Sequence, residues 1–246
     1  MKPKNEFVFG LRSTIEALNS GKEIEKILFK KGLQGHLFHQ LFSAVKKGNI
    51  PYQFVPVEKI NKITRKSHQG VIAFISSIEY KNIEEVLPDL FEKGKLPLLL
   101  ILDKITDVRN FGAIARTAEC ANVNAIIIPE KGSAQINSDA IKTSSGALYT
   151  VSICRTRNLK NTIQYLKESG LQIVAATEKS NKLYYNIDFT LPTAIILGAE
   201  DKGVSTEYLK LSENHVKIPV FGRIGSLNVS VAASIIVYEA IRQRSI

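Results

Sequence analysis

The sequence predicts an α/β protein of two parts, in which a mostly parallel sheet with helices on both faces follows a smaller α/β module. Short apolar strands alternate with helices from Leu98 onward, which is typical of parallel sheets covered on both faces. A shorter alternation of the same kind precedes residue 79. The hydrophobic content of 44% over 246 residues is enough for a sizeable core.

Residues 1–78 form the smaller predicted domain. Its strand patterns cover 24–29, 52–55 and 70–75, and its helical patterns cover 11–18, 37–47 and 57–63. A charged stretch with one short helical pattern at 83–91 follows, and Gly94 and Pro97 interrupt it. We therefore place a linker at residues 79–96.

Residues 97–246 form the larger predicted domain. Strand patterns occur near 98–102, 125–128, 149–154, 171–176, 194–197 and 215–218, and helical patterns near 110–122, 158–169, 205–211 and 229–243. Ligands of parallel sheets bind outside the carboxyl ends of the strands. Asp103, Gly198 and the loop 219–228 each follow a predicted strand directly. We expect these three segments to converge on one edge of the sheet.

The last thirty residues combine an interrupted loop with an apolar helix. Pro219, Gly222 and Gly225 exclude a regular element from the loop. One stripe of the helix holds Val231, Ile235, Tyr238 and Arg242. Small or apolar residues cover most of the remaining surface, so we expect a helix that is buried on most sides. The loop fits either a ligand cradle or an ordinary connection, and its spacing alone does not decide between them.

The composition indicates a soluble globular protein. The longest apolar runs, such as 96–102, are too short to span a bilayer, and the polar start MKPKNEF lacks the core of a signal peptide. We therefore expect a cytoplasmic protein. Cys120 and Cys154 lie in apolar contexts without a second ligand at metal-binding spacing, so we expect both in the core and neither zinc nor a disulfide.

The positive charge is concentrated at the start of the chain. The formal net charge is +10, and residues 1–80 hold 13 Lys or Arg against 6 Glu, a net of +7. A polyanionic partner is favoured, because each neutralised phosphate releases counterions. The alternative is a solvated basic surface that serves solubility.

Three segments of the larger domain resemble the three motifs of the SpoU/TrmH family. They read DKITDVRNFGAIARTAECANVNAIIIP from Asp103, ILGAEDKGVS from Ile196 and SLNVS from Ser226. Members of this family are RNA 2′-O-ribose methyltransferases that use S-adenosylmethionine. The resemblance covers about the whole chain and is closest to bacterial enzymes that methylate a guanosine of 23S rRNA. It implies this activity and this methyl donor, a homodimer, and a reaction that requires no metal.

The resemblance also implies features of the fold that no periodicity predicts. The carboxyl-terminal segment is expected to thread through a loop and form a trefoil knot. The first domain is expected to resemble ribosomal protein L30e and to bind the substrate RNA, because the run from His68 to Val71 is characteristic of that domain in this subfamily. Arg65, Lys66 and His68 are the candidate RNA contacts, although His68 fits equally well as a residue that closes a turn.

Five polar residues are candidates for the chemistry of methyl transfer. Asn110 stands at the start of a predicted helix, where it fits either a helix cap or an active-site role. Arg116 is a lone charge among small apolar residues and fits phosphate binding or catalysis. The resemblance implies that Glu200 orders the catalytic loop. Ser226 and Asn228 are two residues apart, so an extended backbone would point both toward the ribose.

Backbone groups are expected to hold the methyl donor. The resemblance implies contacts from Gly198, Ile218 and Leu227. Adenine requires hydrogen bonds at its edge and apolar walls, which backbone amides and aliphatic side chains supply.

Other functions find little support in the sequence. A glycine-rich dinucleotide fingerprint, a P-loop and an HExxH helix are absent from it. Two alternatives stay open, namely methylation of transfer RNA and a non-catalytic role as an RNA-binding ribosome-assembly protein. The presence of all five polar candidates argues against the second.

Overall fold

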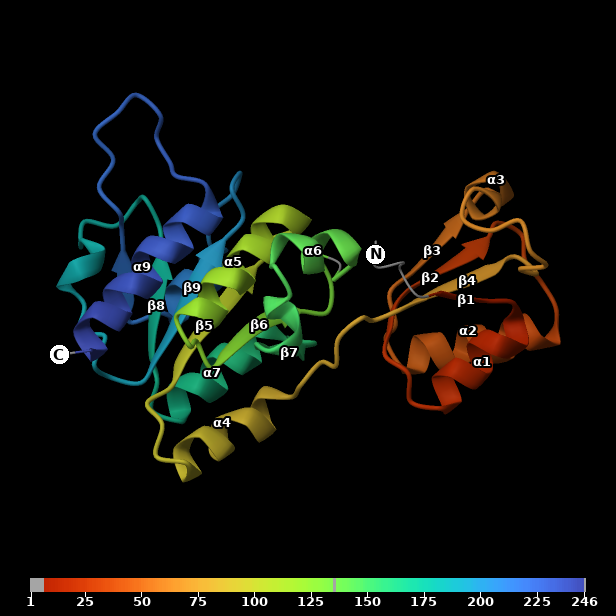
Figure 1. Ribbon diagram of the computed structural model, residues 1–246, viewed down its shortest axis with the longest axis horizontal. Coiled ribbons are helices and arrows are strands. Elements are labelled where there is room, and N and C mark those ends of the chain that lie inside the picture. Colours follow the sequence, from red (N-terminus) through yellow and green to blue (C-terminus); the bar gives the residue numbers. More distant parts are fainter. Residues whose placement is uncertain (1–6, 135, 246) are drawn as a thin grey trace. The chain divides into compact units, whose positions relative to one another are not determined.

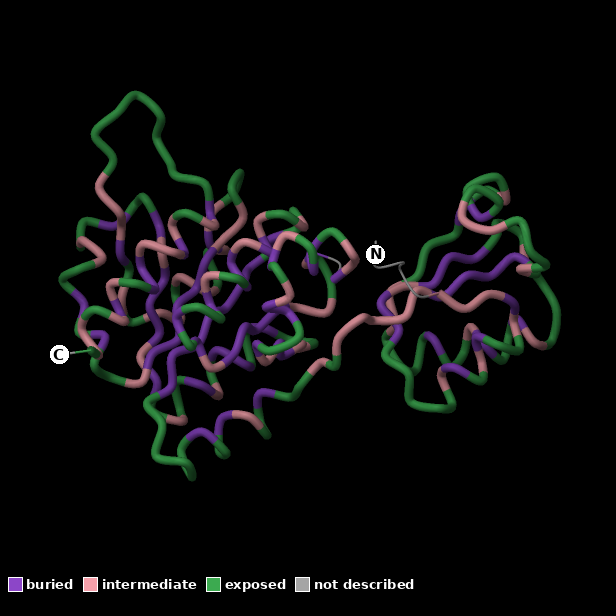
Figure 2. The backbone as a smooth tube through the Cα atoms, viewed as in Figure 1, coloured by how far each residue is buried: buried purple, intermediate pink, exposed green. Residues whose placement is uncertain are grey.

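The computed structural model describes residues 7–134 and 136–245 (Figure 1). The chain divides between Glu79 and Tyr80 into two compact units. In Figure 2 the inner strands of both units are largely buried, and the exposed residues lie mostly on helices, loops and edge strands. None of the helices within the described ranges is long and apolar enough to cross a membrane.

The first unit is a four-stranded sheet covered on both faces. Its strand order is β1-β4-β2-β3, with β1 (Phe7–Phe9), β2 (Ile24–Lys30), β3 (Tyr52–Val55) and β4 (Val71–Ile75). Only the pairing of β2 with β3 is parallel, and β3 is an edge strand. The helices α1 (Leu11–Asn19) and α2 (His36–Lys47) pack on one face around Phe29, whereas Ile60 of α3 (Val57–Asn61) packs on the other.

The second unit is a six-stranded sheet in which every pair is parallel. Its order is β10-β8-β9-β5-β6-β7, with β5 (Leu98–Asp103), β6 (Ala125–Pro129), β7 (Ser152–Thr156), β8 (Gln172–Ala176), β9 (Thr193–Gly198) and β10 (Asn214–Val216). All six residues of β5 are buried, as expected for a strand covered on both faces.

Helices cover both faces of the larger sheet. The helices α4 (Ile83–Glu92), α7 (Leu159–Glu168) and α8 (Thr206–Leu211) share a core with one face. The helices α5 (Val108–Cys120) and α9 (Val229–Arg244) lie side by side on the other, where Thr117 and Ser234 are hydrogen-bonded at 2.9 Å. Shorter elements are α6 (Ser138–Thr143) and the 3₁₀ turns η1 (Ala147–Tyr149) and η2 (Tyr184–Asn186).

The predicted alternation of strands and helices is confirmed, with local differences. The strand β1 and the helix α6 were not predicted, because segments of three and six residues are too short for a periodic signal. Tyr149 lies in a 3₁₀ turn, so the strand predicted at 149–154 begins only at Ser152. The segment 79–96 carries α4, whose Ile83, Leu87 and Leu90 are buried in the core of the second unit.

One burial prediction is wrong, and another holds for most of its helix. Cys120 is exposed at the end of α5, whereas Cys154 is buried as expected and its burial raises the pKa of its thiol to about 12. On α9 the predicted stripe is the outer one, because Val231 and Tyr238 are 47% and 50% exposed. The buried positions of α9 are Val229, Ala233, Ile236, Val237 and Ala240.

Candidate active site

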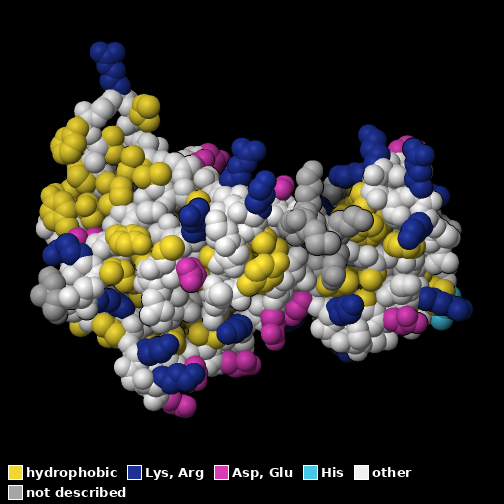
Figure 3. Space-filling view, in the orientation of Figure 1, with side chains coloured by type: hydrophobic (Ala, Val, Ile, Leu, Met, Phe, Trp, Pro, Cys, Tyr) yellow, Lys and Arg dark blue, Asp and Glu magenta, His cyan; other side chains and the backbone are white. Residues whose placement is uncertain are grey.

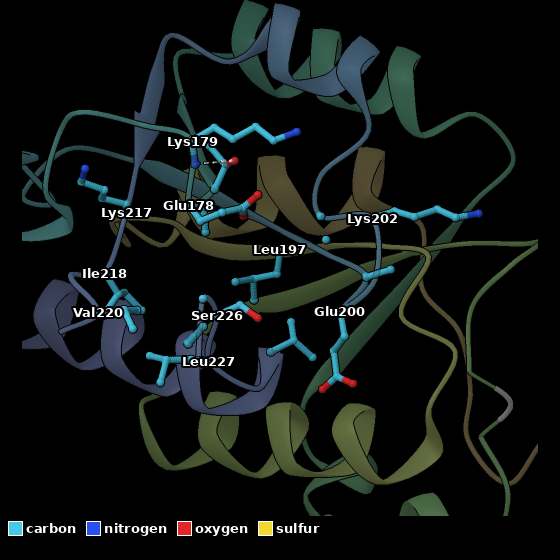
Figure 4. Close-up of a pocket in the computed structure, with 18 of the residues that line it drawn as sticks. Glu178, Lys179, Leu197, Glu200, Lys202, Lys217, Ile218, Val220, Ser226 and Leu227 are labelled. Atoms are coloured by element: carbon cyan, nitrogen blue, oxygen red, sulfur yellow. Dashed lines mark hydrogen bonds between the residues drawn. The ribbon is translucent and has the colours of Figure 1, made fainter. Parts of the chain in front are cut away.

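The loops that follow three parallel strands surround a cavity of about 390 Å³ at the carboxyl edge of the larger sheet (Figure 4). Asp103 and Gly198 are direct partners at the ends of β5 and β9. The walls of the cavity come from the loops after β8, β9 and β10. The expected convergence of the segments at Asp103, Gly198 and 219–228 is therefore confirmed.

The turn after β9 is built on a backbone contact that only glycine permits. A Cβ atom on Gly198 would lie 2.0 Å from the carbonyl carbon of Gly203, so a side chain would force the turn apart. The N–H of Gly203 donates to the carbonyl of Ala199 at 2.7 Å, with Gly203 in the left-handed region at φ 64°. The buried Asp103 carboxylate accepts from the N–H of Ser205 at 2.7 Å, which anchors the end of the turn.

Asn110, Glu200 and Asn228 form a hydrogen-bonded polar triad. The Nδ2 of Asn110 donates to Oε1 of Glu200 at 2.8 Å. The Nδ2 of Asn228 donates to the same oxygen at 2.5 Å and lies 3.0 Å from Oδ1 of Asn110. These side chains come from α5, the turn after β9 and the start of α9, so each motif contributes one residue.

Two of the triad residues lie near helix starts, but only Asn228 is a helix cap. Asp107, not Asn110, is the cap of α5, because its Oδ1 accepts from the N–H groups of Arg109 and Asn110. The side chain of Asn110 is therefore available to the triad. Asn228 caps α9 through its Oδ1, which accepts from the N–H of Ser230 at 2.9 Å. Its amide thus stabilises a helix end and holds the triad at once.

The three candidate donor-binding residues line the cavity of about 390 Å³, which is the larger of two cavities near the triad. Gly198, Ile218 and Leu227 lie in its wall, and Leu197, Val220 and Ile236 add apolar surface. Charged side chains lie around it, among them Glu178, Lys179, Lys202 and Lys217 (Figure 4). A cavity with apolar walls and charges of both signs suits a ligand that combines a flat apolar group with a zwitterionic tail.

Thr177, Glu178 and Lys179 are site residues that the sequence predictions omit. They directly follow β8, whose end lies two strands from β5. The rule that ligands bind at strand ends would have found them, had it been applied to the predicted strand at 171–176 as it was to the other three.

A second cavity of about 210 Å³ lies beside the triad. Its lining includes Lys104, Asp107 and Asn110. Both cavities share Ala199, Glu200, Asp201 and Val229. The turn that carries Glu200 therefore borders both cavities.

Ser226 and Arg116 lie apart from the triad. Ser226 lines the larger cavity, whereas Asn228 turns its amide to Asn110 and Glu200, so the two side chains do not point to one place as expected. Arg116 is exposed on α5, and six residues separate it from Asn110, which is roughly 120° around the helix. The described residues give the Arg116 guanidinium neither a hydrogen bond nor an ion pair within the protein.

The candidate RNA contacts of the first unit have different surroundings. Both ring nitrogens of His68 are engaged, one with Oδ1 of Asn61 at 2.8 Å and the other with the N–H of Gly70 at 3.0 Å. This supports the alternative in which His68 closes a turn. Arg65 and Lys66 are exposed beside it.

The described residues include no group of three or more His, Cys, Asp or Glu side chains arranged to hold a metal ion.

Two family models match the chain. The SpoU rRNA methylase family matches residues 97–238, and the RNA 2′-O ribose methyltransferase substrate-binding domain matches residues 7–81. YacO of Bacillus subtilis, which is assigned to the TrmH family tRNA/rRNA methyltransferases, is 30% identical, with 100% of this chain and 98% of YacO covered. A protein of Staphylococcus aureus strain MSSA476 with the same family assignment is 36% identical over 96% of each chain.

A solved structure shares the fold. The SpoU methyltransferase AviRb from Streptomyces viridochromogenes, in complex with the cofactor AdoMet, superposes with a TM-score of 0.62 at 21% identity. The superposition covers 97% of this chain and 90% of AviRb.

Proposed function

Because the chain belongs to the SpoU rRNA methylase family, we propose that it transfers a methyl group from S-adenosylmethionine to a ribose 2′-hydroxyl of structured RNA. The observation that carries this proposal is the polar triad between two cavities at the end of a parallel sheet. In such an arrangement the two ligands would bind in neighbouring cavities, with the polar groups of the triad beside both.

The larger cavity is the proposed site of the methyl donor. Its apolar walls from Ile218 and Leu227 suit an adenine ring, and the backbone around Gly198 lies at its border. The carboxylate of Glu178 and the ammonium groups of Lys179 and Lys217 suit the opposite charges of an amino acid tail. S-adenosylmethionine supplies, when bound, a methyl group activated by a sulfonium.

The target ribose is proposed to bind at the smaller cavity. Direct displacement requires the 2′-oxygen in line with the methyl group, partial loss of its proton and exclusion of water. Asn110 and Asn228 hold the carboxylate of Glu200 and thereby order the turn between the cavities. Ser226 orients the nucleotide from the side of the larger cavity. Arg116 is proposed to bind the adjacent phosphate and to lower the pKa of the ribose hydroxyl.

The first unit is proposed to bind the RNA. The match of the substrate-binding model to residues 7–81 and the net charge of +7 over residues 1–80 support this role. The proposed domains are residues 1–78 for RNA binding, 79–96 as a linker and 97–246 for methyl transfer. The protein is proposed to be cytoplasmic. We also propose that the first domain resembles ribosomal protein L30e and that the carboxyl-terminal segment of the second domain forms a trefoil knot.

A homodimer is proposed from the apolar surface near the site. Phe221 and Ile224 are 95% and 78% exposed on the loop before α9, and Val231 and Tyr238 are exposed on α9 itself. Hydrophobic side chains cover the projecting loop and its base in Figure 3. A continuous apolar surface of this kind marks an interface, and a second copy of the chain is the expected occupant.

A guanosine of 23S rRNA is the proposed target, and transfer RNA is the alternative. The test is to map 2′-O-methylated nucleotides by mass spectrometry in both RNA classes, with the gene present and deleted. One ribosomal guanosine should lose its methyl group in the deletion strain and regain it when the gene is restored. Loss of a methyl group from transfer RNA instead would move the target, and no loss in either class would contradict the enzymatic proposal.

A further inference from the structure

Two aromatic side chains remain exposed on the edge strand of the first unit. Tyr52 and Phe54 of β3 are 40% and 39% exposed, and they are the large hydrophobic side chains exposed to this degree among the described residues of that unit. Their register partners on β2 are Ile27 and Phe29, so both rings lie on the face covered by α2. The proposed RNA contacts at Arg65 and Lys66 lie elsewhere, in the loop before β4.

The exposed rings are held by other rings. The ring of Phe42 on α2 lies 5.1 Å from that of Tyr52 at an interplanar angle of 80°. The rings of Tyr52 and Phe54 lie 5.9 Å apart at 82°. The buried Phe29 contacts Phe42, Tyr52 and Phe54 from below. We call Phe42, Tyr52 and Phe54 the aromatic edge, a rigid and partly open ring surface.

The surroundings of the aromatic edge are basic. Between Glu25 and Glu58 the chain has five lysines and neither Asp nor Glu. The ammonium of Lys46 lies 4.7 Å from the centroid of the Phe42 ring, and Lys46 and Lys47 are both exposed at the end of α2. By contrast Phe91 of the second unit, which is 41% exposed, stands between Asp89 and Glu92.

We propose that the aromatic edge is a stacking platform for unpaired nucleobases of the substrate RNA, with Lys46 and Lys47 binding the neighbouring phosphates. The proposal rests on the proposed function, since it takes RNA as the ligand. Exposed aromatic rings beside lysines are the combination that binds single-stranded nucleic acid. The substrate would therefore present a loop or bulge to this edge rather than a continuous duplex.

The absence of tryptophan from the sequence provides a direct test. The variant Tyr52→Trp carries a single tryptophan at the aromatic edge, and Phe91→Trp carries one at a similarly exposed position of the second unit whose charged neighbours are of both signs. A single-stranded uridine decamer is the probe, because uridines stack weakly on one another and leave their bases available. The decamer should quench Tyr52→Trp strongly, a duplex of equal length should quench it weakly, and neither should quench Phe91→Trp.

Affinity measurements separate stacking from charge. Tyr52→Ala combined with Phe54→Ala should weaken decamer binding about fivefold or more, whereas Phe91→Ala should leave it unchanged. Lys46→Ala should instead lower the slope of log affinity against log salt by roughly 0.7. Tyr52→Phe should bind as the unaltered protein does. Unchanged circular dichroism and S-adenosylmethionine binding establish that each variant is folded.

Two results would overturn the proposal. One is a tryptophan fluorescence of Tyr52→Trp that does not change when the decamer is added but does change with protein concentration. This result would indicate that the aromatic edge is a contact between copies of the chain. The other is equal decamer affinity in the double alanine variant and in the unaltered protein. Failure of the proposed methyltransferase function would give a different result, in which the unaltered protein binds RNA through the aromatic edge but methylates no RNA.

Discussion

At the scale of single residues, Asn228 carries two tasks that require the two ends of an amide. Its oxygen caps α9, and its NH₂ group binds Glu200 and Asn110. Aspartate has nearly the same shape and caps helices about equally well, but it offers oxygens where the triad requires donors. The two tasks can therefore be separated by one substitution.

Asn228→Asp should retain thermal stability but lose activity. The new carboxylate would face that of Glu200, and the repulsion would displace the turn between the cavities. We expect a melting temperature close to that of the unaltered protein and methylation reduced about 100-fold. Asn228→Ala is the matched control, because it loses the cap as well and should be destabilised by about 1 kcal/mol. Full activity of Asn228→Asp would remove the triad from the mechanism.

Substitutions of Arg116 can distinguish two possible roles of its guanidinium, namely binding of the RNA phosphate and removal of the hydroxyl proton. A guanidinium stays protonated near neutral pH and is a poor base, so binding of the RNA phosphate is the proposed role. Arg116→Lys should then keep partial single-turnover activity and RNA affinity, and Arg116→Ala should lose both. If both variants bind RNA normally but lose methylation equally, Arg116 takes the hydroxyl proton instead.

At the scale of elements, the turn between β9 and α8 depends on the absence of a side chain at Gly198. In Gly198→Ala the new methyl group would collide with the backbone of Gly203, so the wall of the proposed donor cavity must move. We expect S-adenosylmethionine affinity to fall at least about tenfold by calorimetry. Gly222→Ala is the control, since a Cβ atom there meets no other atom within 4 Å. Equal affinities in the two variants would mean that the turn does not shape the donor site.

The last turn of α9 is tied down by a charged hydrogen-bond network. Hydrogen bonds from Arg242, with support from Gln243, lower the pKa of Glu239, and Gln243 also binds the backbone at Ile187 and Phe189. Because the pKa of Glu239 is lower in the folded state, its ionised carboxylate stabilises the fold at pH values above the ordinary pKa of about 4.3. This stabilisation is lost as the pH falls through the folded-state pKa.

Glu239→Gln should therefore be less stable than the unaltered protein at pH 7, and the difference should be smaller near pH 3. The difference at pH 7 should be below about 1 kcal/mol, because the partner Arg242 is largely exposed to solvent. Urea denaturation at the two pH values measures it. A difference that persists undiminished at pH 3 would assign the effect to packing rather than to charge.

The sequence predicts the elements better than it predicts their faces and contacts. Strand and helix patterns identify the sheet, and the strand-end rule alone predicts that Gly198 and the loop 219–228 meet. Periodicity finds the stripe of Val231 and Tyr238 on α9 but not its direction, because small residues on the opposite side allow α5 to approach closely. Hydrogen bonds between residues 118 positions apart, as in Asn110 and Asn228, follow from the topology and not from local spacing.

At the scale of the whole molecule, charge and apolar surface are distributed unequally. The first 80 residues carry +7 of the total +10, whereas the most exposed hydrophobic side chains, Phe221 and Ile224, belong to the second unit. Under the proposed function the first unit supplies long-range attraction to RNA and the second supplies self-association.

Phe221→Asp should convert the proposed dimer into a monomer. The side chain is 95% exposed, so the substitution does not disturb the core, but it places a charge in the proposed interface. Sedimentation at micromolar concentration should give a species near 27.3 kDa for the variant and about twice that mass for the unaltered protein. Tyr149→Asp, at another exposed position, serves as the control. A monomer in every case would contradict the homodimer.

The distance along the chain from the first unit to Asn228 sets an order of events during translation. The ribosome delivers the first unit about 150 residues before it delivers Asn228, which at about 5–20 residues per second is a delay of roughly 8–30 s. During that interval the nascent chain already has its RNA-binding unit but not the residue that completes the triad. Under the proposed function a half-made chain can hold RNA without modifying it, and methylation begins only after Asn228 has been added.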